Sequence, residues 1–194
     1  MAEQPKVSVA GSAYKIDGKA HEIQPNQPIR REDGKLCGVT NPRQMTYIHS
    51  YGGEAPFFEG VAEGKLLATR CDNDKCAFKG TVHLPFRIYC PDCLRKANII
   101  DVTDLARKTA KIHSYIVTSR TGAFNTLDIP IRFVDIEIEG IATILKSYLL
   151  VGEPEIGMRV VPIFRTKEPT YTITDLAFAK EGTKENELPE GFSF

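Results

Sequence analysis

The chain has 194 residues, with 25 basic and 25 acidic side chains, so its formal net charge is zero. This balance argues against a dedicated nucleic-acid-binding protein, which usually carries a basic excess. No apolar run approaches the roughly 20 residues that span a bilayer, and the first five residues contain no apolar signal core, so we expect a cytoplasmic protein without membrane contact.

Residues 1–46 form an extension that is rich in turn signals. Asp17-Gly18 lies between short flanks in residues 14–23, and Asp33-Gly34 lies within residues 29–39. Each dipeptide favours a β-hairpin. The extension contains too few apolar residues to form a core of its own, so we expect it to lie on the rest of the protein or on a partner.

Residues 47–64 predict a helix. Pro56 falls in the first turn, where its missing N–H costs nothing, and Gly64 follows the last turn. Phe57 and Phe58 begin an apolar stripe at helical spacing. Two interpretations remain open. The helix packs on the chain's own core, or the paired Phe57 and Phe58 dock into another protein.

Residues 65–110 carry the strongest signal, a pair of closely spaced cysteine pairs. Cys71 and Cys76 are followed, after 13 intervening residues, by Cys90 and Cys93. Four thiolates in tetrahedral geometry make a closed structural site for one zinc ion, although a rubredoxin-like iron site uses the same ligands. Two disulfides or a redox-active Cys-x-x-Cys pair are weaker alternatives, because such a pair normally opens a helix. Cys37 is left over as a structural or free thiol.

When the chain is divided into residues 1–60, 61–111, 112–165 and 166–194, only the segment that holds the four paired cysteines has a positive net charge. Residues 61–111 contain ten basic and six acidic side chains, a net charge of +4. Such a patch can attract a phosphate-bearing ligand, or it is an ordinary solvated surface.

The pattern becomes β from residue 111 onward. Five strand-like runs cover residues 111–119, 129–139, 141–151, 158–165 and 171–179. A five-stranded Greek-key barrel of the OB type fits this count. We therefore predict a mainly β protein in which a zinc ribbon (65–110) precedes an OB-fold barrel (111–180). Residues 181–194 form an acidic tail that we expect to be mobile or bound to a partner.

The sequence contains no recognisable catalytic motif. The four histidines, His21, His49, His83 and His113, are scattered, and no zinc-protease, nucleophile-elbow or phosphate-loop pattern is present. We assign no catalytic residue.

Three runs carry a resemblance to a known family. They are PFFEGVAEGKLLATRC at residues 56–71, PFRIYCPDC at residues 85–93 and IGMRV at residues 156–160. Together they resemble the zinc-ribbon and OB-fold proteins described as DUF35, over roughly residues 47–180. The chain departs from that family in two respects. Its first cysteine pair is separated by four residues rather than two, and it has a long N-terminal extension.

The resemblance implies an accessory subunit of a thiolase-superfamily enzyme, either a thiolase or a thiolase-like aldolase. Such a chain would share acyl-CoA or CoA with its partner in an α2β2 assembly and have no activity alone. Cations around the ribbon would then contact CoA phosphates, and the candidates are Lys75, Lys79, Arg87, Arg95 and Lys96. The extension and residues 49–54 look most like the small subunits of benzoylsuccinyl-CoA thiolases, which cleave an aromatic 3-oxoacyl-CoA in anaerobic toluene degradation.

Two other functions remain open on the sequence. OB barrels also bind single-stranded nucleic acid through basic grooves with stacked aromatics, but the barrel segment here is not basic. A rubredoxin-like electron carrier would require iron in the four-cysteine site.

Overall fold

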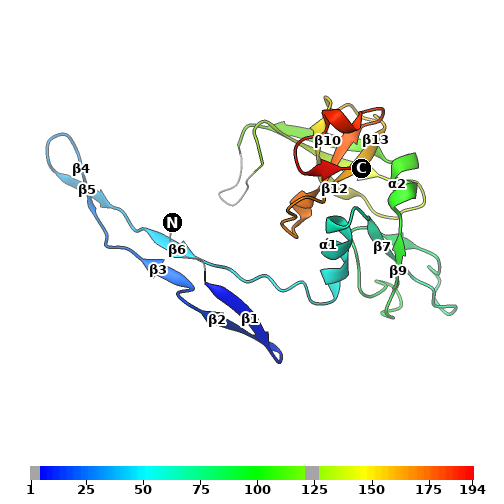
Figure 1. Cartoon of the computed structure of the whole chain (residues 1–194), viewed down its shortest axis with the longest axis horizontal. Helices are drawn as coiled ribbons and strands as arrows, with labels where there is room; N and C mark the ends of the chain where they lie inside the picture. The colour runs from blue at the N-terminus through cyan, green and yellow to red at the C-terminus, as the bar shows by residue number, and fades with distance from the viewer. Residues whose placement is uncertain (1–4, 121–126) are drawn as a thin grey trace. The chain divides into compact units, whose positions relative to one another are not determined.

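The computed structural model describes residues 5–120 and 127–194, and it divides into two units (Figure 1). The first unit ends at Ser50, and the second runs from Tyr51 to Phe194. Within the described residues, no helix is both long enough and apolar enough to cross a bilayer.

The first unit consists of two-stranded antiparallel sheets. The pairs are β1 (Lys6–Ala10) with β2 (Ala13–Asp17), β3 (His21–Ile23) with β6 (Arg43–Met45), and β4 (Pro28–Arg30) with β5 (Leu36–Val39). None of the described residues up to Ser50 is buried. This unit therefore has no hydrophobic core of its own.

One of the two predicted hairpins is confirmed. Strands β4 and β5 flank the Asp33-Gly34 turn, where the Gly34 N–H donates to the carbonyl of Arg31 at 2.9 Å. The hairpin predicted around Asp17-Gly18 is wrong. Residues 13–17 pair with residues 6–10 instead, because Gly11 at φ +64° supplies a two-residue turn between two runs of matching alternation.

The second unit begins with a short 3-10 turn, η1 (Gly52–Glu54), and the predicted helix, α1 (Ala55–Ala62). Pro56 lies in its first turn and Gly64 follows it at φ +77°, as their chemistry favours. A second helix, α2 (Thr103–Thr109), follows the cysteine segment.

A small sheet carries the cysteine segment. Its strand order is β8 (Val82–His83), β7 (Leu67–Arg70) and β9 (Asn98–Asp101), all antiparallel. Beyond β8, the Ala142 N–H donates to the Val82 carbonyl at 3.0 Å, and the Leu84 N–H donates to the Thr143 hydroxyl at 2.9 Å. These bonds tie the cysteine segment to the larger sheet.

The larger sheet has six strands in the order β10–β11–β12–β14–β13–β15. Their bounds are β10 (Lys111–Thr118), β11 (Ile131–Glu137), β12 (Leu145–Val151), β13 (Val160–Arg165), β14 (Leu176–Lys180) and β15 (Phe192–Ser193). Among the described strands of this sheet, β12 and β14 are the one pair that runs parallel. At the start of β10, the Ile112 N–H donates to Met158 and the Val160 N–H donates to Ala110, so the first strand also meets the residues leading into β13.

Each predicted strand-like run contains an observed strand, but the last begins late. Residues 171–175 form a turn that includes η2 (Ile173–Asp175), and β14 starts only at Leu176. Buried Asp175 accepts hydrogen bonds from the Thr170 N–H at 2.8 Å and from the Thr170 hydroxyl at 2.7 Å. Such local side-chain bonds compete with a strand ladder.

One hydrophobic core joins α1, α2, the cysteine segment and the larger sheet. Its fully buried members include Val61 of α1, Ala106 of α2, Leu66 and Leu84 beside the ribbon, and Phe164 and Phe178 of the sheet. Each large side chain buried in this way stabilises the fold by about 1.5–3 kcal/mol. The second unit is therefore held together as one body.

Residues 181–194 fold onto the larger sheet, so the expectation of a mobile tail is wrong, while a contact of this segment with a partner stays a prediction. Strand β15 pairs with β13, and Leu188, Phe192 and Phe194 pack against a second cluster around Ile163. The Arg165 guanidinium lies 5.0 Å from the centre of the Phe192 ring. Three apolar side chains are enough to fold this acidic segment back onto the sheet.

Candidate metal centre

The four predicted cysteines meet at one point. The sulfur atoms of Cys71, Cys76, Cys90 and Cys93 all lie within 4.8 Å of one another, with 3.7 Å between Cys71 and Cys93 and 4.0 Å between Cys76 and Cys90. A tetrahedron with metal–sulfur bonds of ~2.3 Å has edges of about 3.8 Å, so zinc fits this cluster. A disulfide requires sulfur atoms about 2.05 Å apart, and the cysteines are free thiols. The disulfide alternative is therefore wrong.

The first cysteine pair lies in the loop that leaves β7. The Cys71 N–H donates to Thr81 at 3.1 Å, and the Gly80 N–H donates back to the Cys71 carbonyl at 2.7 Å, which closes the loop. Inside it, the Cys76 N–H donates to Asn73 at 2.9 Å. The extra residues between Cys71 and Cys76 form this turn, so the wider spacing still delivers two sulfurs.

The second pair lies in a tighter turn. The Cys90 N–H donates to Arg95 at 2.9 Å, and the Leu94 N–H donates to the Cys90 carbonyl at 3.0 Å. Leu94 adopts φ +57°, a left-handed conformation that a branched side chain rarely takes. This backbone turn points Cys93 back toward Cys90 and the first pair.

The pKa values of two of the cysteine thiols show how the cluster would respond to a bound cation. Hydrogen bonds from the Asn73 side chain and the Arg95 backbone lower the pKa of Cys93 to about 6. The Asn73 backbone favours the Cys71 thiolate, but burial and the three neighbouring sulfurs outweigh it and raise the pKa of Cys71 to about 12. A divalent cation would displace the remaining protons and hold all four groups as thiolates.

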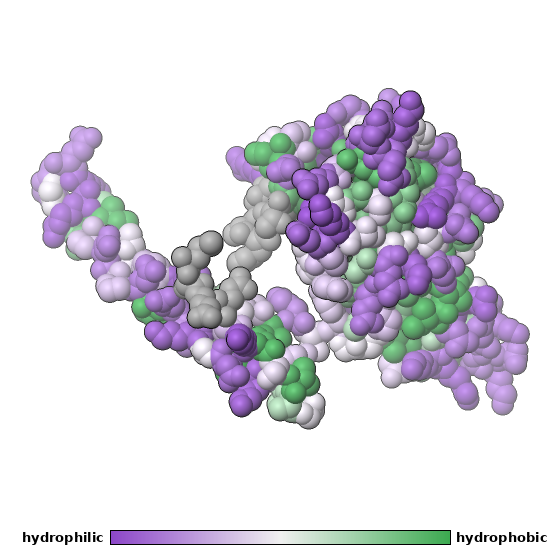
Figure 2. Space-filling model, viewed as in Figure 1, coloured by the Kyte–Doolittle hydropathy of each residue, from purple (hydrophilic) through white to green (hydrophobic). Residues whose placement is uncertain are grey.

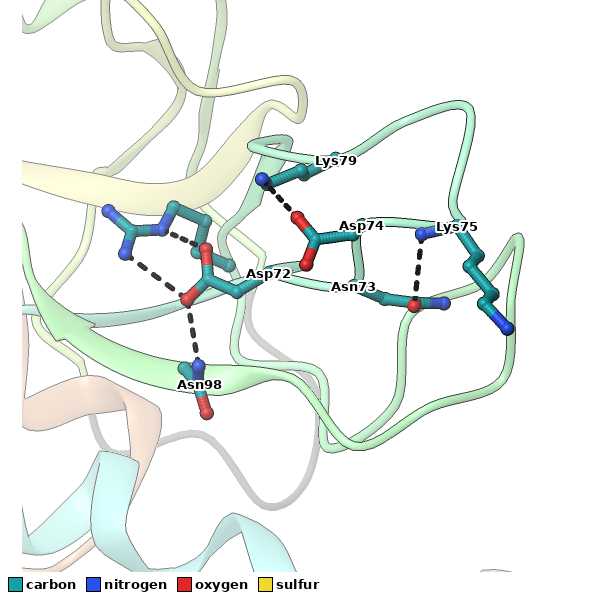
Figure 3. Close-up of polar contacts among 7 residues, drawn as sticks. Asp72, Asn73, Asp74, Lys75, Lys79 and Asn98 are labelled. Atoms are coloured by element: carbon teal, nitrogen blue, oxygen red, sulfur yellow. Dashed lines mark hydrogen bonds and ion pairs between the residues drawn. The ribbon is translucent and has the colours of Figure 1, made fainter.

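Asn73 is a supporting residue that the sequence analysis did not single out. It touches both pairs, through its backbone at Cys71 and its side chain at Cys93, and its side-chain oxygen also accepts the Lys75 N–H at 3.2 Å (Figure 3). An asparagine two residues after the cysteine that follows a strand is a turn signal, and this signal could have identified Asn73 from the sequence.

Ion pairs neutralise the carboxylates beside the cluster. Arg70 donates to both oxygens of Asp72 at 2.7 and 3.1 Å, and Asn98 donates to Asp72 at 2.7 Å. The Arg70 and Asn98 hydrogen bonds lower the pKa of Asp72. Asp74 is paired with Lys79, whereas the Lys75 ammonium points away from these carboxylates (Figure 3).

The structure brings three of the five predicted CoA-binding cations together. Lys75, Arg95 and Lys96 line a shallow hollow of about 490 Å³ with Asp72, Asn73, Asp74 and Asn98. Within the described residues, none of these three cations forms an ion pair. Lys79 is occupied by Asp74 and Arg87 does not line the hollow.

The docking prediction is wrong for Phe57. Its side chain is 3% exposed and packs in the chain's own core, 6.4 Å from the Phe86 ring. Gly60 lets α1 lie close to β7, because a Cβ there would come within 2.8 Å of Leu67. Phe58 is half-buried, with its ring stacked on Tyr51 at 3.9 Å, and its docking role stays a prediction.

His83 is not part of the sulfur cluster. It is 7% exposed on β8, and neither of its ring nitrogens has a hydrogen-bond partner within the described residues. A buried polar group without a partner costs about 1–3 kcal/mol. We therefore expect His83→Leu to leave the free energy of unfolding in urea unchanged or to raise it.

Ser147 provides the control for that measurement. It is equally buried, and its hydroxyl donates to the Leu176 carbonyl at 2.9 Å. Ser147→Ala should lower the free energy of unfolding by about 1 kcal/mol, because this hydrogen bond is lost. A larger loss from His83→Leu than from Ser147→Ala would mean that the imidazole makes a stabilising contact.

Two solved structures are similar to part of this chain. No protein-family model and no curated protein matches the sequence. A DUF35 protein of unknown function from Sulfolobus solfataricus is similar with a TM-score of 0.46 and 24% identity, over 65% of this chain and 83% of that one. The Ltp2-ChsH2(DUF35) aldolase is similar with a TM-score of 0.49 and 22% identity, over 66% of this chain and 93% of the other.

Proposed function

We propose that this chain is a non-catalytic accessory subunit of a thiolase-superfamily enzyme that acts on acyl-CoA. The observation that carries the proposal is the closed four-sulfur cluster. Four protein ligands would occupy all four coordination positions of a tetrahedral zinc ion and leave none for water or substrate. The metal would therefore cross-link the ribbon rather than take part in a reaction.

The strand order supports an OB-type barrel behind the ribbon. Strands β10, β11, β12, β14 and β13 follow one another, and the start of β10 returns to the residues before β13. Five of the six described strands, with one parallel pair between β12 and β14, would form the five-stranded, partly open Greek-key barrel of an OB fold, and β15 would lie outside it. Ribbon and barrel would together present a rigid surface to a partner.

The chemistry of thiolysis would come from that partner. A thiolase needs a cysteine nucleophile beside an activating base. The only cysteine outside the sulfur cluster is Cys37, which is exposed and whose thiol lies 3.4 Å from the Ile29 carbonyl, an acceptor that is not a base. We infer that the partner is a thiolase-fold protein, in an α2β2 complex, and that the substrate is an aromatic 3-oxoacyl-CoA such as benzoylsuccinyl-CoA.

An activity assay tests this division of labour. Thiolysis of benzoylsuccinyl-CoA should be absent with this chain alone and present when it is combined with the thiolase-fold protein that co-purifies with it. Thiolytic activity of the isolated chain would contradict the proposal, and so would co-purification with nucleic acid instead of a thiolase-fold protein.

Charge reversal tests the contact with CoA. Lys75, Arg95 and Lys96 share one hollow and have no ion-pair partner in the part of the chain that the structure describes, so they can bind phosphates. In the assembled complex, Lys96→Glu should raise KM for the acyl-CoA, and more so at low salt. Arg87→Glu, which lies outside the hollow, is the matched control. Equal KM values for both variants would leave Lys96 as a solvated surface residue.

A further inference from the structure

A hollow of about 500 Å³ lies in the second unit, where β12, the end of β13, β15 and the start of β11 meet. Its volume is in the range of small-molecule pockets, about 300–1,000 Å³. Buried Ile131, Leu149 and Tyr148 line it beside half-buried Phe192. Apolar patches also lie between polar areas elsewhere on the visible surface of the second unit (Figure 2), so the charged groups of the hollow must identify its ligand.

Arg165 is the charged group of this hollow whose hydrogen-bond donors are unused. Its side chain is 39% exposed, and its guanidinium lies over the Phe192 ring, 5.0 Å from the ring centre. The buried Asp175 carboxylate is 3.9 Å away, beyond hydrogen-bond distance, and its two oxygens accept hydrogen bonds from Thr170 instead. Among the described residues, no acceptor forms a hydrogen bond with the Arg165 guanidinium.

The other charged groups that line the hollow are paired or exposed. Arg132 donates to both oxygens of Glu153, at 2.5 and 3.3 Å. Glu190 lies 3.5 Å from the Lys167 ammonium. Asp128 is exposed, so water weakens the field of its charge. In the described lining, the guanidinium over the Phe192 ring is therefore the cation that lacks an anion within hydrogen-bond distance.

We propose that this hollow binds a small carboxylate with an aromatic body. A guanidinium that lies flat on a ring keeps its N–H edge free, and two parallel N–H donors match the two oxygens of a carboxylate. Ile131 and Leu149 contact the apolar body, and the rings of Tyr148 and Phe192 favour an aromatic one. The inference does not depend on the proposed function, because the site uses only the second unit of this chain.

Titration of the full-length chain with benzoate, followed by two-dimensional NMR, tests the site. Benzoate should bind with a Kd on the order of 1 mM or below, and the shifted amide signals should include those of Ile131, Leu149 and Phe192. Benzamide has the same shape without the charge, and acetate has the charge without the ring. Each should bind at least about tenfold more weakly than benzoate.

Two arginine variants locate the anion contact. Arg165→Gln should weaken benzoate binding at least about tenfold. Arg132→Gln is the matched control, because Arg132 lines the same hollow but is bound to Glu153, and it should stay within about threefold of the unaltered chain.

Arg165→Lys keeps the positive charge near buried Asp175, so it decides the question if Arg165→Gln does not fold. It lacks the planar pair of donors and should also bind benzoate more weakly than the unaltered chain. Equal affinity for benzoate and benzamide, unchanged affinity in Arg165→Lys, or no shifted signals at about 10 mM benzoate would overturn the inference. Each of these results would leave the hollow as a solvated surface and the proposed function unaffected.

Discussion

Replacing Cys90 by serine should empty the metal site and unfold the ribbon. Cys90 is fully buried and its sulfur lies 4.0 Å from that of Cys76. Structural zinc is coupled to folding and contributes ~10 kcal/mol or more in small ribbons. We expect one zinc per chain in the unaltered protein and less than stoichiometric zinc in Cys90→Ser, measured by elemental analysis, together with loss of the cooperative thermal transition.

Cys37→Ser is the matched control for this experiment. Cys37 is exposed in the first unit and does not belong to the sulfur cluster. Its replacement should leave both the zinc content and the melting temperature unchanged. A Cys90→Ser protein that still held one zinc and melted like the unaltered chain would refute the four-sulfur site. Stoichiometric iron in the unaltered protein would point to the electron carrier instead.

Truncating Phe57 should destabilise the second unit far more than truncating Phe58. Phe57 is 3% exposed within the core, next to Phe86 and at the edge of the Phe58 ring. Removing a buried phenyl ring leaves a cavity and costs about 3–5 kcal/mol. Phe58→Ala removes a half-buried ring that stacks on Tyr51, so it should lower the free energy of unfolding by a clearly smaller amount.

Urea denaturation of the two alanine variants measures this difference. Equal and small losses would mean that α1 is not anchored in the chain's own core, and would return Phe57 to the docking role. A zinc content that stays at one per chain in Phe58→Ala would show that the change is confined to the helix surface.

Much of the second unit follows from local sequence pattern. Cysteine spacing predicts the sulfur cluster, since two short loops must each deliver two ligands. Pro56 and Gly64 bracket α1 because their backbone preferences act at the helix ends. Alternation of apolar residues locates the strands, because one face of each strand is buried.

The pairing of strands that are distant in the sequence, and the partners of individual side chains, could not be predicted from local sequence pattern. Asp17-Gly18 is a good turn sequence, yet residues 21–23 pair with residues 43–45, a choice that depends on the whole extension. The sequence does not show which of the five predicted cations are free to bind a ligand. Lys79 forms an ion pair with Asp74, whereas the Lys75 ammonium points away from that carboxylate. Tail packing through Phe192 depends on an edge of β13 that the sequence does not mark.

The mass of the native complex tests the central claim most directly. The chain is co-expressed with the thiolase-fold protein that co-purifies with it, and the assembly is weighed by native mass spectrometry. The account predicts two copies of each chain and one zinc ion bound to each copy of this one. A folded, zinc-loaded chain that remains monomeric beside its intended partner would contradict the claim that it is an accessory subunit.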